Sequence, residues 1–185
     1  MDPELTKIVG ILIAAAIGAV VVLIAVLAVA RRRLEQGWRT TQHQRSLLYD
    51  RLKNQGLLVN RFVETANHRL TNQRESLEVL LRRQTEVAAG RTPPEKAVAI
   101  IELNSHLEKL ISIADNDPGL AGLSEYEELR EMIEQAVDDI GRAAASYNET
   151  ADAYNRQASG FFGRLFGSLE AERFDASKRK RASRL

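Results

Sequence analysis

Two glutamate–histidine pairs are the side chains best placed for chemistry in this sequence. Glu64 precedes His68 by four positions, and Glu102 precedes His106 by four. Residues four apart lie on one face of a helix, so each pair could supply two metal ligands. Di-metal sites in helical bundles instead use glutamate and histidine three apart, with inward-facing glutamates from two further helices. Ordinary exposed pairs are therefore favoured over a metal site.

Other catalytic and cofactor patterns are missing from the sequence. The chain has no cysteine, which excludes disulfides, zinc–thiolate sites, iron–sulfur clusters, a cysteine nucleophile and a lipoprotein anchor. It also lacks the G-x-S-x-G, P-loop, G-x-G-x-x-G and H-E-x-x-H patterns. We therefore expect no enzymatic activity, no catalytic residue, no cofactor, no metal and no small-molecule substrate.

A repeated tyrosine–asparagine pair is the most distinctive pattern near the C-terminus. Tyr147-Asn148 recurs one heptad later as Tyr154-Asn155, and Phe161 follows after another heptad. Seven residues make almost two helical turns, so the three rings are predicted to stack along one side of a helix. Packing in the core is the favoured interpretation, because aromatic stripes at helical spacing are usually core. A ligand or partner surface is the alternative.

The N-terminal region contains a predicted transmembrane helix over residues 8–30. It has no charged, polar or proline residue, and its roughly 34 Å as a helix exceeds a hydrocarbon core of about 30 Å. A cleaved signal peptide is the alternative, since residues 28–30 read Ala-Val-Ala. The acidic leader, with Asp2 and Glu4, and the long apolar run oppose that alternative.

Three arginines set the predicted orientation of this helix. Arg31, Arg32 and Arg33 follow the apolar run directly, and clustered cations stay on the cytoplasmic side. We therefore expect residues 1–7 outside the membrane and the chain from residue 31 onward in the cytoplasm.

The remainder of the chain shows the apolar spacing of amphipathic helices, which predicts an all-α protein with almost no sheet. Gly56 marks either a bend in one long helix or a turn between two. Capping boxes at Thr92-x-x-Glu95 and Ser124-x-x-Glu127 start two later helices, and a turn cluster separates them at residues 115–119. Gly160 and Gly163 end the last helix. The stripe residues are Leu48, Leu52, Val59, Phe62, Val63, Ala66, Leu70, Leu77, Leu80 and Leu81, then Val98, Ile101, Leu103, Leu107, Leu110 and Ile111, then Leu129, Ile133, Val137, Ile140, Ala144, Tyr147, Ala151 and Tyr154.

Charge is divided unevenly along the chain. The net charge is +7 over residues 31–92, −10 over residues 93–177 and +5 over the last eight residues. Opposite signs on early and late helices favour antiparallel packing. The basic tail, residues 176–185, is too short and too poor in aromatic residues to read nucleic acid, so no nucleic-acid partner is expected. It either attracts anionic lipid or stays solvated.

Several of these residues together resemble the LemA family. The likeness is strongest at the paired Tyr-Asn motif with Phe161, and it departs from the family pattern at Gly56, Asp138 and Phe162. Further similar positions are Leu165-Phe166-Gly167, Ala171-Glu172, Phe174-Asp175, Tyr49-Asp50, Asn60, Val63-Glu64-Thr65, Pro118, Leu120, Tyr126, Leu129, Glu131 and Ile140. The resemblance supplies no catalytic residues.

The resemblance implies an antiparallel, up-and-down bundle of about four long helices behind the membrane anchor. Residues 31–175 would be this cytoplasmic bundle of a single-pass bacterial inner-membrane protein. The functional hypothesis is a non-enzymatic interaction or adaptor module for another membrane-associated protein, with a protease or quality-control complex as the suggested partner.

Two alternatives remain open. A self-assembling structural protein, a homo-oligomer, could use the small residues of the membrane helix, which are Gly10, Gly18, Ala14, Ala15, Ala16 and Ala19. A metal-binding bundle would use the paired glutamates and histidines.

Overall fold

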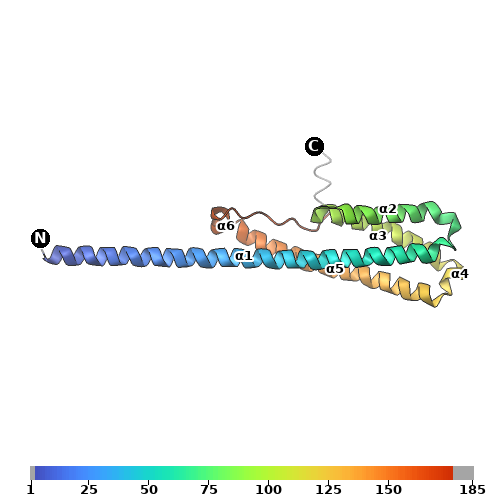
Figure 1. The fold of residues 1–185 in the computed structure, drawn as a ribbon, viewed down its shortest axis with the longest axis horizontal. Coiled ribbons are helices and arrows are strands. Elements are labelled where there is room, and N and C mark those ends of the chain that lie inside the picture. Colours follow the sequence, from blue (N-terminus) through green and yellow to red (C-terminus); the bar gives the residue numbers. More distant parts are fainter. Residues whose placement is uncertain (1–2, 177–185) are drawn as a thin grey trace, which may run out of the picture.

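The structure is a computed structural model that describes residues 3–176, with side chains at Ile13 and from Ala15 onward. Within this range the regular structure is all helical and contains no strand, as predicted. The elements are α1 (Pro3–Asn67), the 3₁₀ helix η1 (Thr71–Gln73), α2 (Arg74–Ala89), α3 (Pro93–Asp115), α4 (Pro118–Ala121), α5 (Ser124–Ala158) and α6 (Phe161–Leu165). Figure 1 shows α1 as one long rod whose second half packs with the other helices.

The apolar N-terminal segment and the first helix of the folded domain form a single helix. α1 has 65 residues, which corresponds to roughly 98 Å. Between Ile17 and Val29 its apolar side chains are exposed, except that of Leu27, which is half-buried. By length and composition this helix can cross a membrane.

The second half of α1 packs antiparallel against α5. Along α1 the partners on α5 fall in reverse order: Thr41 Oγ1 lies 3.3 Å from Thr150 O, and Ser146 Oγ donates to Gln44 Oε1 over 3.2 Å. Further along, ion pairs join Arg51 to Asp139 and Arg61 to Glu125, and the rings of Phe62 and Tyr126 lie 6.5 Å apart. The two helices contribute much of one continuous core, which includes Leu48, Leu52, Val59, Phe62, Leu129, Ile133, Ile140, Tyr147 and Tyr154.

The second helical pair, α2 and α3, also runs antiparallel. Arg83 pairs with Glu102, and Lys96 Nζ donates to Val87 O over 2.7 Å at the C-terminal end of α2. The predicted capping box at Thr92 and Glu95 is present and starts α3. The prediction that Ile101 belongs to the buried stripe is wrong, because its side chain is exposed. Leu103, Leu107 and Leu110 of the same stripe are buried.

Gly56 lies inside α1, so the alternative of a turn between two helices is excluded. The Gln84 side-chain amide of α2 donates to Gly56 O over 3.0 Å. A Cβ at position 56 would lie 3.1 Å from Gln84 Nε2. A larger residue at position 56 would therefore require the Gln84 side chain to shift slightly.

Two local expectations are wrong. The chain breaks its helix at residues 68–73, which the apolar stripe did not indicate, because Leu70 and Leu77 are buried on both sides of the turn. Ser124 does not form a capping box. The N-cap is Leu123, whose carbonyl accepts from Tyr126 N and Glu127 N, and it makes no side-chain cap bond.

The two capping predictions can be separated by mutation. Thr92→Ala removes a hydroxyl that accepts from Glu95 N, and we expect it to lower the free energy of unfolding by about 1 kcal/mol. Ser124→Ala is the matched control, with an expected change below about 0.5 kcal/mol because no cap bond is lost. Thermal unfolding of the full chain in mild detergent, followed by circular dichroism, measures both. Equal losses of stability would contradict this assignment.

Candidate functional site

The C-terminal part of the described chain is an extended segment that returns along α5. Residues 168–176, named here the strap, follow α6 and contain no helix. In Figure 1 this segment runs from α6 back toward α2. Two of its apolar side chains join the core, with Ala171 buried and Phe174 packed against it.

The two asparagines of the repeated motif hold the strap. Asn155 Nδ2 donates to Ala171 O, and Ala171 N donates back to Asn155 Oδ1, both over 2.8 Å. Asn148 pairs in the same way with Phe174, over 3.1 Å to its carbonyl and 2.7 Å from its amide. Each asparagine thus satisfies both backbone groups of one strap residue, as a neighbouring β-strand would.

This geometry explains the heptad spacing of the motif. Asn148 and Asn155 are seven helical residues apart, which is roughly 10.5 Å along α5. Phe174 and Ala171 are three residues apart in extended chain, which is roughly 10 Å. The two rises match, so a Tyr-Asn pair at every seventh position can bind an antiparallel extended segment at every third.

Tyr147 and Arg173 add bonds between the same two segments. The Tyr147 hydroxyl donates to Glu172 O, between the two asparagine contacts. Burial raises the pKa of this phenol, which keeps it protonated as a donor. Arg173 pairs with Asp152 of α5 at the exposed side of the strap.

Tyr154 has a different contact from Tyr147. Its ring lies 5.2 Å from the ring of Trp38 on α1, and a Cβ at Gly37 would lie 3.4 Å from its Cδ2. Tyr147 and Tyr154 are both buried, at 2% and 5% exposure. These two rings are therefore core side chains of the α1–α5 contact.

Phe161 does not continue this stack, and the stacking prediction is wrong for it. α5 ends at Ala158, and Phe161 begins α6 with its ring exposed. A Cβ at Gly163 would overlap the Ala158 carbonyl, and Gly167 has a φ of +65°. These two glycines permit the reversal from α5 through α6 into the strap.

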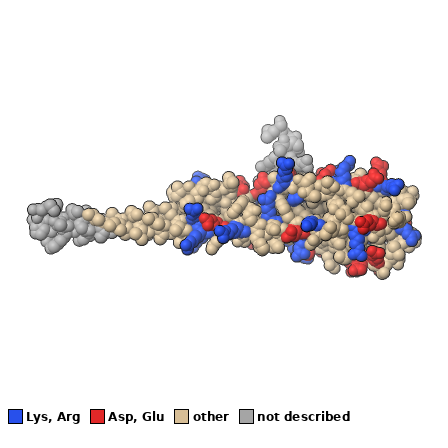
Figure 2. Space-filling model, in the orientation of Figure 1, with Lys and Arg blue, Asp and Glu red and all other residues tan. Residues whose placement is uncertain are grey.

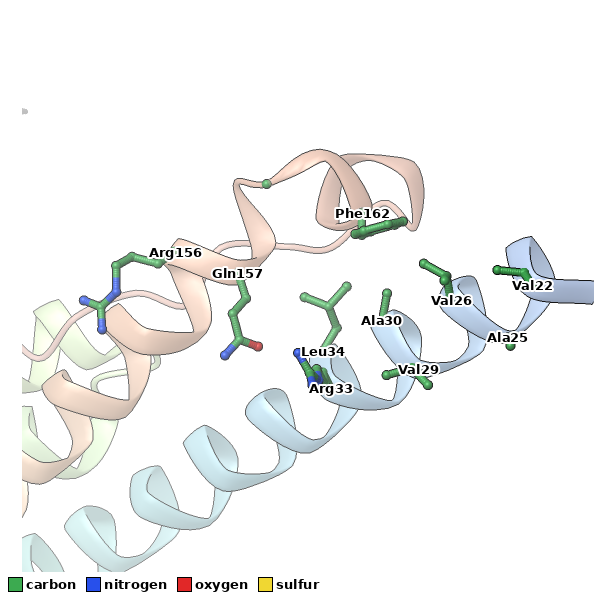
Figure 3. A pocket seen from close by; sticks show the side chains of 11 residues that line it. Val22, Ala25, Val26, Val29, Ala30, Arg33, Leu34, Arg156, Gln157 and Phe162 are labelled. Atoms are coloured by element: carbon green, nitrogen blue, oxygen red, sulfur yellow. The ribbon is translucent and has the colours of Figure 1, made fainter. Parts of the chain in front are cut away.

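A mainly apolar groove lies between α6 and the N-terminal half of α1. It has a volume of about 710 Å³. Figure 3 shows Phe162 of α6 facing Val26 and Ala30 of α1. Arg156 and Gln157 of α5 line the end of the groove nearest the bundle.

Several arginines lie near the end of the bundle that borders this groove. Arg31, Arg32 and Arg33, predicted from sequence to set the orientation, are exposed on α1, and Arg33 lines the groove. Arg31 also pairs with Glu35. Figure 2 shows basic side chains gathered where the narrow apolar part of α1 meets the wider bundle.

The glutamate–histidine pairs lie apart from this region. Glu64 and His68 are exposed, and His68 follows the end of α1. His106 Nε2 lies 3.1 Å from Ser76 O, whereas Glu102 pairs with Arg83. Across the part of the chain that the structure describes, no three histidine, cysteine, aspartate or glutamate side chains cluster as metal ligands.

Sequence reasoning missed a cluster of cations around Tyr49. The Lys96 ammonium lies 4.9 Å from the centre of the Tyr49 ring, and the Arg45 guanidinium lies 5.2 Å from it. Burial, together with the nearby Arg45, lowers the pKa of Lys96. Lys96 also donates to the last carbonyls of α2, so the cluster joins α1, α2 and α3. The residues of this cluster are far apart in the sequence, so their spacing gives no sign that they meet.

Comparison with models of protein families gives a match over most of the chain. The model described as the LemA family matches residues 47–183, which is most of the chain. The matched range contains both Tyr-Asn pairs and the strap, and it begins after the apolar segment and its arginines. The curated proteins contain no match to this chain.

Loss of an asparagine pairing is expected to free the strap. Asn155→Ala removes two hydrogen bonds to Ala171, and trypsin should then cleave after Arg173 several-fold faster than in the parent protein. Asn148→Ala should do the same through Phe174. Asn72→Ala, in the exposed turn η1, is the matched control and should leave cleavage unchanged. Unchanged cleavage in both Asn155→Ala and Asn148→Ala would contradict the conclusion that these asparagines hold the strap.

The buried ring of Tyr154 provides a second test. Tyr154→Ala should lower the free energy of unfolding by roughly 3 kcal/mol, as for other large aromatic truncations in a core. Tyr154→Phe keeps the ring against Trp38 and should cost less than about 1 kcal/mol. Chemical unfolding of the full chain in detergent measures both. If Tyr154→Ala kept the stability of the parent protein, the assignment of this ring to the core would be wrong.

Proposed function

The chain belongs to the LemA family, and we propose that it is a non-enzymatic, membrane-tethered adaptor for another membrane-associated protein. The observation that supports this most is the continuity of α1. One helix carries the exposed apolar segment and then the core residues Leu48, Leu52 and Phe62. A domain joined in this way is concentrated at the bilayer without a flexible linker.

The proposed topology is single-pass, with residues 1–7 outside and the domain in the cytoplasm of a bacterium, at its inner membrane. The apolar helix acts here as an uncleaved anchor. Arg31, Arg32 and Arg33 support this orientation, because arginines beside a span favour the cytoplasmic side.

We also propose that the domain is an up-and-down bundle of four helices, made by the second half of α1 with α2, α3 and α5. The antiparallel pairing of α1 with α5 and of α2 with α3 supports this arrangement. From Ala30 to Asn67 the helix rises about 56 Å, so docking faces would extend that far from the membrane.

The perturbed ionisable groups support a non-enzymatic role, because their contacts join helices or the strap. Lys96 binds the end of α2, and Tyr147 binds the strap. Tyr126 donates to Asp115 over 2.7 Å, and burial raises its pKa. Such shifts arise in structural contacts as well as in active sites.

Photocrosslinking in native membranes tests the adaptor role. A photoreactive phenylalanine at exposed Ile101 or Leu57 should capture the same protein repeatedly, and membrane proteases and quality-control complexes are the class we expect. The same substitution at buried Leu107 is the control and should capture none. Failure to recover a reproducible partner from either exposed site counts against an adaptor.

The same experiment separates the self-assembly alternative. Among the described residues, no other segment comes within 4 Å of a Cβ placed at Gly18 of α1. If adducts form only between copies of this chain, and the protein is oligomeric in mild detergent, the structural role replaces the adaptor role.

A further inference from the structure

The segment around α6 exposes an apolar surface. Residues 160–169, named here the α6 tip, leave Phe161 at 75%, Leu165 at 56% and Leu169 at 77% exposure. Arg164 is the only charged residue among these ten. Several large apolar side chains exposed together on a short segment indicate an interaction surface.

The α6 tip lies beside the apolar part of α1. Phe162 shares one groove with Val22, Val26 and Val29, and Figure 3 shows it directly opposite α1. From Val22 to Ala30, the end of the predicted span, α1 rises about 12 Å. With α1 across a bilayer, the tip therefore lies at the depth where headgroups meet acyl chains, since interfacial elements bury their apolar face about 5–10 Å there.

Basic and aromatic side chains mark the same level. The six arginines at positions 31, 32, 33, 39, 156 and 164 lie within residues 31–40 and 156–169, where Glu35 is the only acidic residue. Arg33 and Arg156 line the bundle end of the groove. Trp38, which follows Arg33 on α1 by five residues, is partly exposed. Tryptophan and arginine both favour the membrane interface.

The tip is also held in place. Immediately after it, Asn155 binds Ala171 and Asn148 binds Phe174, so the strap returns to α5. The chain reverses at Gly163 and Gly167, and the two asparagines hold the strap that follows. The tip is therefore held next to α1.

We propose that the α6 tip is a second membrane contact that binds anionic phospholipid. Its apolar side chains enter the leaflet that α1 leaves, and one acyl chain occupies the groove against Val26 and Phe162. The lipid phosphate pairs with Arg33, and Arg156 adds positive charge at the same end of the groove. This inference rests on the proposal that α1 spans the membrane, and it is independent of the adaptor role.

A lipid fits this surface better than a protein partner does. The apolar lining is continuous with the exposed face of α1 that would meet acyl chains, and the two cations that line the groove, Arg33 and Arg156, lie at its bundle end. That order of apolar and cationic groups matches the order of acyl chain and phosphate in a phospholipid.

Spin labels can measure the depth of the tip, because the chain has no cysteine. Leu165→Cys in the full chain, reconstituted in vesicles of phosphatidylcholine and phosphatidylglycerol, should show several-fold lower collision with a water-soluble nickel relaxant than Glu128→Cys, an exposed site of α5. Val21→Cys reports on α1. A lipid-buried label at position 21 with a water-exposed label at 165 overturns this inference alone, and water at both overturns the span as well.

Native mass spectrometry of the full chain tests the headgroup site with phosphatidylglycerol as the probe. The parent protein should retain bound phosphatidylglycerol in preference to phosphatidylcholine, and Arg156→Gln should lose that preference. Arg142→Gln, at an exposed arginine of the same helix, is the matched control and should keep it. Equal retention in both variants, or label-to-label contact between copies at position 165, overturns the proposed lipid site.

Discussion

The antiparallel contact between α1 and α5 is the constraint on which the rest of the structure depends. It buries Leu48, Val59 and Phe62 against Ile133, Ile140 and Tyr147 in one core. Because α5 runs back toward the apolar end of α1, its last turn is placed at Gly37 and Leu34. The α6 tip, the groove and the strap all follow from where α5 ends.

Polar groups in this contact set its register more than its stability. The ion pairs of Arg51 with Asp139 and of Arg61 with Glu125 are partly exposed, and such pairs contribute about 0–1 kcal/mol. They agree with the charge asymmetry between early and late helices. A further polar group lies where α1 meets α3: Gln55 of α1 is fully buried and donates to Asn104 of α3, while its Oε1 has no hydrogen-bond partner among the described residues. A buried amide of this kind disfavours other alignments of the helices.

The sequence predicted the helices where apolar period and capping chemistry agree, as at Thr92 and along the stripe from Leu129 to Tyr154. It failed at Leu70 and Ser124, because a buried stripe can continue across a turn and a serine near a helix start need not be its cap. The sequence pattern identified the repeated asparagines but not the strap that they bind. Their ligands are the backbone groups of Ala171 and Phe174, which any residue carries, so no side-chain pattern could have revealed the strap.

The unbroken course of α1 has a mechanical consequence. With α1 across a membrane, as proposed above, a continuous helix converts tilt of its apolar segment into movement at its other end. Over the roughly 56 Å from Ala30 to Asn67, a change of about 10° in tilt moves the distal turn by about 10 Å. Tilting is one way in which an apolar helix fits bilayers of different thickness. The thickness of the membrane would thus set the position of the α2–α3 face above it.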